Sequence, residues 1–264
     1  MTDAELTDPM TQELRVFWQP GCSSCLRTKE FLTENGVPFR SVDVLNDDGG
    51  MAELAALGIR TVPIVARGRE YVSGQILRDV AAFAGIDGGS EVLPPDQLKA
   101  RIDTVIAAAM RYAAQLPHQH LDDMLPDRPR SYRDLACHVF QIVEAFIAET
   151  GGDPLTAQKY EDPAPKGVRT VSDIVFFGYA TQKRFSGWWD GGGHDFTRKA
   201  DVYYGDQTLH DFMERTAWHA GQHTRQLMLV LEKLGVSPDQ PLMDQDFAGL
   251  PMPKEVWDNE KRWD

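Results

Sequence analysis

Apolar and polar residues in the first third of the chain form short runs that fit alternating strands and helices. Leu14 to Trp18 is an apolar and aromatic run that ends at Pro20-Gly21, a pattern typical of a buried strand followed by a turn. The next stretch, from Cys25 to Asn35, spaces apolar side chains among polar ones and reaches a stop signal at Asn35-Gly36. These residues predict a strand, a turn and a helix.

The same region continues with four further patterns. In chain order we expect an extended stretch at Pro38–Leu45, a short helix at Gly50–Leu57, strands at Pro63–Ala66 and Glu70–Val72, and a helix at Gln75–Ala84. The resulting order, β-α-β-α-β-β-α, predicts a compact α/β domain around a central sheet.

The composition changes at residues 85–90, where the sequence reads GIDGGS, and Pro94-Pro95 then precede a long helical pattern. Such a segment is typical of a linker between domains. Beyond it, four long amphipathic patterns follow at residues 95–116, 131–150, 171–188 and 206–234. Four long helices joined by connections of varied length predict an all-α domain, a four-helix bundle.

Two further segments carry weaker patterns. The connection at residues 151–169 is rich in Pro and Gly, which indicates an irregular crossover or a lid. Residues 237–264 form a C-terminal extension that we expect to pack as irregular coil with a short helix. The chain has 264 residues, more than one compact domain usually needs, so its length also favours two domains.

Composition and charge exclude several classes of protein. No apolar run approaches the roughly 18 residues that a membrane helix needs, and the polar first dozen residues do not resemble a secretory signal. We therefore expect a soluble, cytoplasmic protein without a membrane partner. Its 27 basic and 40 acidic residues give a net charge of −13, which would repel a phosphate backbone, so a nucleic-acid partner is not expected.

Two of the three cysteines lie in a Cys-x-x-Cys motif where the first strand meets the first helix. Cys22 would occupy the helix N-terminus, where backbone N–H groups and the helix dipole stabilise a thiolate. Cys25 lies one turn later and could resolve a mixed disulfide formed at Cys22. We interpret the motif as a catalytic redox pair. Half of a zinc site and two inert core thiols are the alternatives; the lack of a second cysteine pair and the Pro-Gly turn disfavour them.

Three of the seven histidines have a spacing that suits a metal site. His219 and His223 are four residues apart, so both project from one helix face and can chelate one ion. His138 lies in a helical pattern whose apolar positions turn it toward the core. A hydrogen-bonded core histidine and a solvated pair are the alternatives, and spacing alone leaves them open.

The first region resembles the glutaredoxins over residues 12–86. The resemblance rests on the run from Phe17 to Cys25 (FWQPGCSSC), on Lys29 and on Thr61-Val62-Pro63. It implies a thiol redox domain with a thioredoxin fold and a cis peptide bond before Pro63. Ser-Ser replaces the family's usual Pro-Tyr between the cysteines.

The glutaredoxin resemblance also implies a site for a small thiol. By position in the family pattern, the thiol-binding residues would be Val62, Pro63, Ser73 and Gly74. The ligand would be glutathione or another low-molecular-weight thiol. Gln75 stands where an acidic residue often follows in the family.

The second region, residues 95–236, resembles the DinB-like bundle family of metalloenzymes. It shares Leu-x-x-His, ending at His138, in the second long helix, and His-x-x-x-His, at His219 and His223, in the last one. The resemblance implies a divalent ion, zinc or nickel, held by these three histidines with solvent completing the shell. Thr224-Arg225 replaces the family's Arg-Gly after the second histidine.

The remaining candidates are weaker. Cys137 adjoins His138 but points about 100° away around the helix, so we expect a core thiol. His118 and His120 lie in a Pro-flanked loop and are expected at the surface. His194 follows three glycines and has no clear partner in the pattern.

Several relatives in the DinB-like family are thiol transferases or isomerases that use a small thiol. The two resemblances together imply a metal-dependent thiol transferase or a related thiol-using enzyme, whose glutaredoxin-like domain performs thiol-disulfide exchange. Its partners would be a small thiol and an electrophilic or disulfide substrate, with a homodimer left open. A redox or metal sensor, and a plain disulfide reductase, are the alternatives.

Overall fold

The computed structural model describes residues 13–87, 92–258, 260 and 263. Its contacts divide the chain into two compact units. The first comprises residues 1–89 with 257–262 and 264, and the second comprises residues 90–256 with 263. The linker expected at residues 85–90 lies partly outside the described residues.

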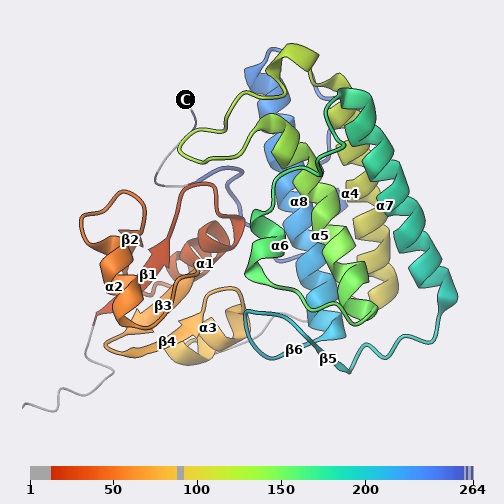
Figure 1. The fold of residues 1–264 in the computed structure, drawn as a ribbon. Helices are drawn as coiled ribbons and strands as arrows, with labels where there is room; N and C mark the ends of the chain where they lie inside the picture. Colours follow the sequence, from red (N-terminus) through yellow and green to blue (C-terminus); the bar gives the residue numbers. More distant parts are fainter. Residues whose placement is uncertain (1–12, 88–91, 259, 261–262, 264) are drawn as a thin grey trace, which may run out of the picture. The chain divides into compact units, whose positions relative to one another are not determined.

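The first unit contains a four-stranded mixed sheet in the order β2-β1-β3-β4 (Figure 1). The central strand β1 runs parallel to β2 and antiparallel to β3, and β3 pairs with β4 in a hairpin. The strands are β1 Leu14–Trp18, β2 Arg40–Asp43, β3 Ile64–Arg67 and β4 Glu70–Ser73. The predicted small central sheet is therefore confirmed.

Helices cover both faces of this sheet. They are α1 Ser23–Glu34, α2 Gly50–Ala56 and α3 Leu77–Ala84. Phe17 of β1 packs with Leu54 of α2 in one core cluster. Val16, whose side chain points to the other face, packs with Leu32 of α1 and Val80 of α3 in a second cluster. The alternation of apolar side chains along β1 thus produces two separate cores.

The turn before α3 lies against the cis peptide bond between Val62 and Pro63, which the glutaredoxin resemblance implied and the structure confirms. Gly74 N donates a hydrogen bond to Pro63 O at 2.9 Å, and Thr28 Oγ1 of α1 donates to Gly74 O at 2.6 Å. A Cβ atom at residue 74 would lie 2.8 Å from Pro63 Cβ, closer than packed atoms allow. Glycine is therefore needed here for close approach.

Asp258 and Glu260, near the end of the chain, belong to the first unit, which the sequence did not indicate. Lys29 of α1 is fully buried, and its Nζ lies 3.3 Å from Asp258 Oδ1 and 3.1 Å from Glu260 Oε1. Ser41 Oγ of β2 donates to Glu260 Oε1 at 2.7 Å. The described residues of the C-terminal extension are otherwise coil with one short 3₁₀ helix, η3 Asp244–Phe247.

The second unit is mostly helical, as predicted. Four long helices, α4, α5, α7 and α8, run side by side, and α4 and α5 each contact both α7 and α8 (Figure 1). The bounds of the helices are α4 Pro95–Gln115, α5 Tyr132–Thr150, α6 Ala157–Glu161, α7 Val171–Gly191, α8 Leu209–Lys233 and η2 His118–His120. Two short strands, β5 Lys199–Ala200 and β6 Gln207–Thr208, form a small hairpin before α8.

Sequence signals fix where three of the long helices begin. Each starts with a capping box, in which a Ser or Thr side chain accepts from the backbone three residues later and an Asp side chain accepts in return. The pairs are Ser131 with Asp134, Thr170 with Asp173, and Thr208 with Asp211.

Helix α7 approaches its neighbours at Gly178. A Cβ atom there would lie 2.6 Å from Phe140 Cζ of α5 and 2.6 Å from Met110 Cγ of α4. The connection at residues 151–169, expected to be an irregular crossover or lid, contains the short helix α6, which contacts α5. This contact places Tyr160 of α6 in the interior of the unit, at 7 % exposure.

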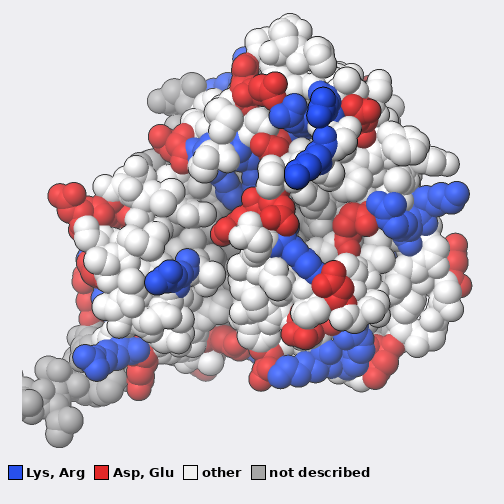
Figure 2. All heavy atoms as spheres, viewed as in Figure 1, with Lys and Arg blue, Asp and Glu red and all other residues white. Residues whose placement is uncertain are grey.

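Charged side chains of both signs are interspersed on the face drawn in Figure 2. The net charge of the whole chain is −13. Across the described ranges, none of the helices combines the length and the apolar content that a membrane crossing needs.

Candidate redox and metal sites

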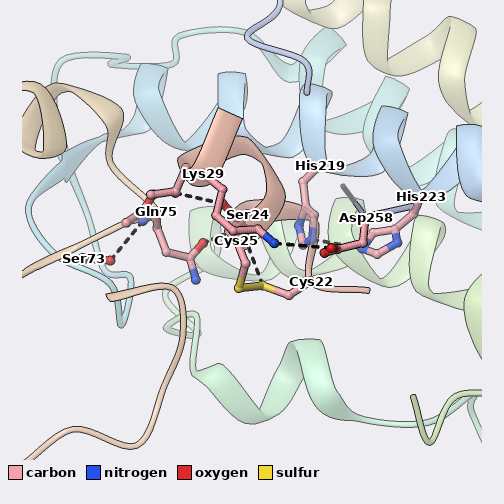
Figure 3. The surroundings of a disulfide bond; sticks show 11 residues. Cys22, Ser24, Cys25, Lys29, Ser73, Gln75, His219, His223 and Asp258 are labelled. Atoms are coloured by element: carbon pink, nitrogen blue, oxygen red, sulfur yellow. Dashed lines mark hydrogen bonds and ion pairs between the residues drawn. A yellow bond between two sulfur atoms is a disulfide. The ribbon is translucent and has the colours of Figure 1, made fainter. Parts of the chain in front are cut away.

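Cys22 and Cys25 form a disulfide at the start of α1 (Figure 3). Cys22 is the N-cap residue of the helix, and its Sγ accepts a hydrogen bond from Cys25 N at 3.2 Å. The backbone donors at the helix N-terminus therefore face Cys22, where they stabilise a thiolate after reduction. Cys22 is half-buried and Cys25 is fully buried, so an incoming disulfide reaches Cys22 more easily.

Gln75 fixes the position of this helix, a role that sequence reasoning missed. Its side-chain Oε1 accepts from Ser24 Oγ at 3.0 Å (Figure 3). Its backbone oxygen accepts from Arg27 Nη2 at 2.7 Å. Both bonds are buried. A glutamine can accept here without bringing a negative charge into the interior, which gives a physical reason for its presence in place of an acid.

The four residues expected to bind a thiol lie along one edge of the first unit. Ser73 at the end of β4 pairs with Ile64, directly after Pro63, and Gly74 bonds to Pro63 O. Thr28 links this edge to α1, because its Oγ1 bonds both to Ser24 O and to Gly74 O. The backbone around the cis peptide is thereby held against the helix that carries the cysteines.

The three predicted metal ligands converge in the interior of the second unit. His138 projects from α5, and His219 and His223 project from consecutive turns of α8. Each offers one ligand atom, and these atoms lie within 4.8 Å of one another with all three residues buried. His219 Nε2 and His223 Nε2 are 3.1 Å apart. Two nitrogen ligands of one tetrahedral zinc ion lie about 3.3 Å apart.

Hydrogen bonds define the state of His223. Its Nδ1 lies 2.7 Å from Gln226 Oε1, and because an amide oxygen can only accept, Nδ1 carries the proton. Nε2 then presents its lone pair toward the other two histidines. A carbonyl-type acceptor behind a ligating histidine is the usual arrangement in metal sites. His138 Nδ1 is buried and has no hydrogen-bond partner among the described residues, so it too is available to an ion.

His219 is held differently. Arg215 Nη1 lies 3.2 Å from His219 Nδ1, and an arginine can only donate. In the neutral ring the proton then sits on Nε2, which points toward His223 Nε2. If His219 binds an ion through Nε2 as a neutral ring, Nδ1 must take the proton and Arg215 must withdraw. The donor set fits a divalent ion, and this one hydrogen bond competes with it.

Aromatic rings enclose Arg215 and the histidines. The guanidinium of Arg215 lies 4.9 Å from the ring centroid of Tyr160, 4.7 Å from that of Tyr204 and 5.7 Å from that of Trp218. The ring of Tyr160 lies 5.2 Å from that of His219 and 6.0 Å from that of His138. Burial raises the pKa of Tyr160 to about 12, so its phenol stays protonated at neutral pH.

The three histidines are held in their neutral form. Burial lowers the pKa of each well below its usual value. The next cause is the positive charge of Arg130 for His138 and His223, and that of Arg215 for His219. Neutral imidazole is the form that binds a metal ion, so the rings need lose no proton before they bind one. The same positive charges also oppose a cation at this place.

The other candidates lie outside this cluster. Cys137 is buried, and burial raises the pKa of its thiol to about 12, in keeping with the expected core thiol. His120 Nδ1 pairs with Asp123 at the surface, and His194 stacks on Trp188 with ring centroids 3.9 Å apart. Among the described residues, the group His138, His219 and His223 is the one that could hold an ion.

No curated protein matches this chain. The glutaredoxin family model matches residues 14–72, which include the disulfide, the cis peptide bond and most of the sheet. That match ends before the helical unit, for which the resemblance to the DinB-like family stays a prediction. Residues 14–72 are thus a glutaredoxin domain, followed in the same chain by a mostly helical remainder.

Proposed function

We propose that this chain is a metal-dependent thiol-using enzyme, in which the glutaredoxin domain performs thiol-disulfide exchange and the helical unit is a DinB-like four-helix bundle. The observation that carries the proposal is the convergence of His138, His219 and His223 in a buried site with neutral rings. Three protein nitrogens leave a coordination position for a substrate, as in catalytic zinc sites.

The redox step uses the two cysteines of α1. Cys22 thiolate attacks one sulfur of a disulfide R–S–S–R′, forms a mixed disulfide and releases R′–S⁻. Cys25 gives up its proton to solvent and attacks Cys22 Sγ, which forms the Cys22–Cys25 disulfide and releases R–S⁻. Two molecules of glutathione or another small thiol reduce the pair again and leave as their own disulfide.

The helical unit would hold zinc or nickel through the three histidines, and the bound ion would supply a Lewis acid that keeps a small thiol as its thiolate. Gln226 would keep the proton of His223 on Nδ1 and so leave Nε2 for the ion. Buried aromatic residues, Tyr160 and Trp218, would exclude water from the electrophile. The thiolate would attack an electrophilic carbon to give a thioether and a leaving group.

A second function, a metal sensor, is favoured by one contact. Arg215 donates to His219 Nδ1 and would have to withdraw when a neutral His219 binds an ion through Nε2. Because Arg215 also lies over Tyr160 of α6, its movement could carry ion binding to the surface of the unit. In this alternative the ion changes the conformation without turnover.

Turnover separates the two functions. We would load the protein with zinc or nickel and screen small thiols against electrophiles, following loss of thiol and formation of thioether by mass spectrometry. The enzyme predicts thioether formation that His223→Ala abolishes and Cys22→Ser leaves in place. Ion binding without turnover by any pair would favour the sensor. Disulfide reduction that depends on Cys22, without ion binding, would leave a plain reductase.

A further inference from the structure

One cation near the histidines has a buried donor atom without a partner among the described residues. Arg130 precedes α5 and is 7 % exposed. Its Nη2 donates to Tyr160 O at 2.9 Å, whereas its Nη1 is buried and has no hydrogen-bond partner among the described residues. No carboxylate of the described residues forms an ion pair with it. A buried charged donor without a partner is costly, and it calls for an explanation in function.

Arg130 is linked to the histidine site through Tyr160. The carbonyl that it bonds is that of Tyr160, whose ring contacts both His138 and His219. Its charge is, after burial, the largest cause that lowers the pKa of His138 and of His223. The positive charge therefore acts on the place where the proposed ion and its ligand would lie.

Other cations add to that charge, and the two acids that act on Arg130 form no ion pair with it in the described part of the chain. Arg215 contacts His219, and the charge of Arg128 acts on all three histidines. Asp134 is the nearest acid on α5, but its two oxygens already accept from the Ser131 cap and from Ala164 N. Glu161 attracts Arg128 and Arg130 but lies at the surface. The surroundings thus favour an anionic ligand.

We propose that the histidine site binds a small molecule through a carboxylate that accepts from Arg130 Nη1. This inference rests on the proposed function and specifies it: the thiol or the electrophile used at the site is a carboxylic acid. A planar guanidinium matches a carboxylate closely and forms charge-assisted hydrogen bonds with it. A neutral ligand would leave the buried cation unmatched, and a phosphate dianion would need more donors than Nη1 supplies.

The test compares thiols that differ in charge. We would titrate cobalt-loaded protein with 3-mercaptopropionate and with 2-mercaptoethanol, and follow the sulfur-to-cobalt absorption band. Wild type should bind the carboxylate-bearing thiol at least about tenfold more tightly. This ratio corresponds to the free energy of one hydrogen bond to a charged group. Arg130→Met should remove most of that preference, with both affinities measured at the same cobalt occupancy as wild type and the affinity for 2-mercaptoethanol as the reference. Arg133→Met, three residues later and in α5, should keep the preference.

A second arm works without an ion, so failure of the metal site and failure of this inference are distinct. Propionate and inorganic phosphate are titrated calorimetrically into chelator-treated full-length protein. Binding of propionate that Arg130→Met weakens supports the inference even if cobalt does not bind. Equal affinity of wild type for the two thiols, no binding of propionate, or phosphate binding as tight as propionate overturns it. If Arg130→Met does not fold, the wild-type affinities for the two thiols, for propionate and for phosphate still test the inference. Arg130→Lys, which keeps the positive charge, then replaces the methionine variant.

Discussion

The ammonium of Lys29 lies 3.3 Å from the carboxylate of Asp258, and both side chains are fully buried (Figure 3). Lys29 Nζ also lies 3.4 Å from the ring centroid of Trp18, so an aromatic face and two carboxylates surround one cation. Asp258, near the end of the chain, thereby packs into the first unit against Lys29, which lies one turn beyond Cys25 on α1.

Removing Asp258 should destabilise the first unit. Asp258→Ala leaves a buried ammonium with only the half-exposed Glu260, and breaking such a pair should cost about 2 kcal/mol or more of unfolding free energy. Urea denaturation followed by Trp fluorescence measures this. Glu260→Gln is the matched control and should cost much less, because exposed pairs contribute little. Equal effects of the two variants would show that Asp258 has no special role.

Cys22 should be the reactive thiol of the reduced protein. It caps α1 and is half-buried, whereas Cys25 and Cys137 are fully buried and the pKa of Cys137 is raised to about 12. Iodoacetamide at neutral pH should therefore label Cys22 first, as peptide mapping would show. Faster labelling of Cys25 or Cys137 would reverse the assigned roles.

Ser24 and Gln75 should be energetically coupled. Their buried side-chain hydrogen bond is 3.0 Å long, and we expect a coupling energy of about 1 kcal/mol in a double-mutant cycle of Ser24→Ala and Gln75→Ala. The bond from Arg27 goes to the backbone of residue 75 and survives in Gln75→Ala. Additive effects of the two substitutions would mean that this hydrogen bond does not hold α1 in place.

Gln226 should raise metal affinity without being a ligand. Replacing it with leucine removes the acceptor that holds the proton on His223 Nδ1, and loss of such a partner weakens metal binding about 10- to 100-fold. Competition with a chromophoric chelator measures the change. Gln222→Leu is the matched control, because Gln222 is buried on the same helix and bonds to the backbone at residues 255 and 256. Similar losses in both variants would point to a general packing effect.

Local patterns predicted most helices and strands, and long-range contacts account for the differences. The end of α7 was expected at Trp188, but the helix continues to Gly191. In this last turn the ring of Trp188 packs on Phe146 of α5 and stacks with His194. Cys22 was expected at the N-terminus of α1 and is its N-cap residue, so the helix begins at Ser23, two residues before the apolar pattern that starts at Cys25. Such boundaries depend on neighbours that a local pattern does not contain.

The same distinction applies to the sites. The spacing of His219 and His223 is visible in the sequence, and Arg215 lies one turn earlier on the same face, so this contact could have been expected. Arg130, Tyr160 and Gln75 could not, because each reaches its site from a separate segment of the chain. Asp258 has no local signal at all, since its partner Lys29 is 229 positions away.

The metal content of the purified protein tests the central claim most directly. After purification without chelators and dialysis against zinc or nickel, wild type and the controls His118→Ala and His120→Ala should hold about one ion per chain. His138→Ala, His219→Ala and His223→Ala should each hold almost none, because two nitrogens bind such an ion too weakly. A wild type without stoichiometric metal, or alanine variants that keep it, would contradict the account.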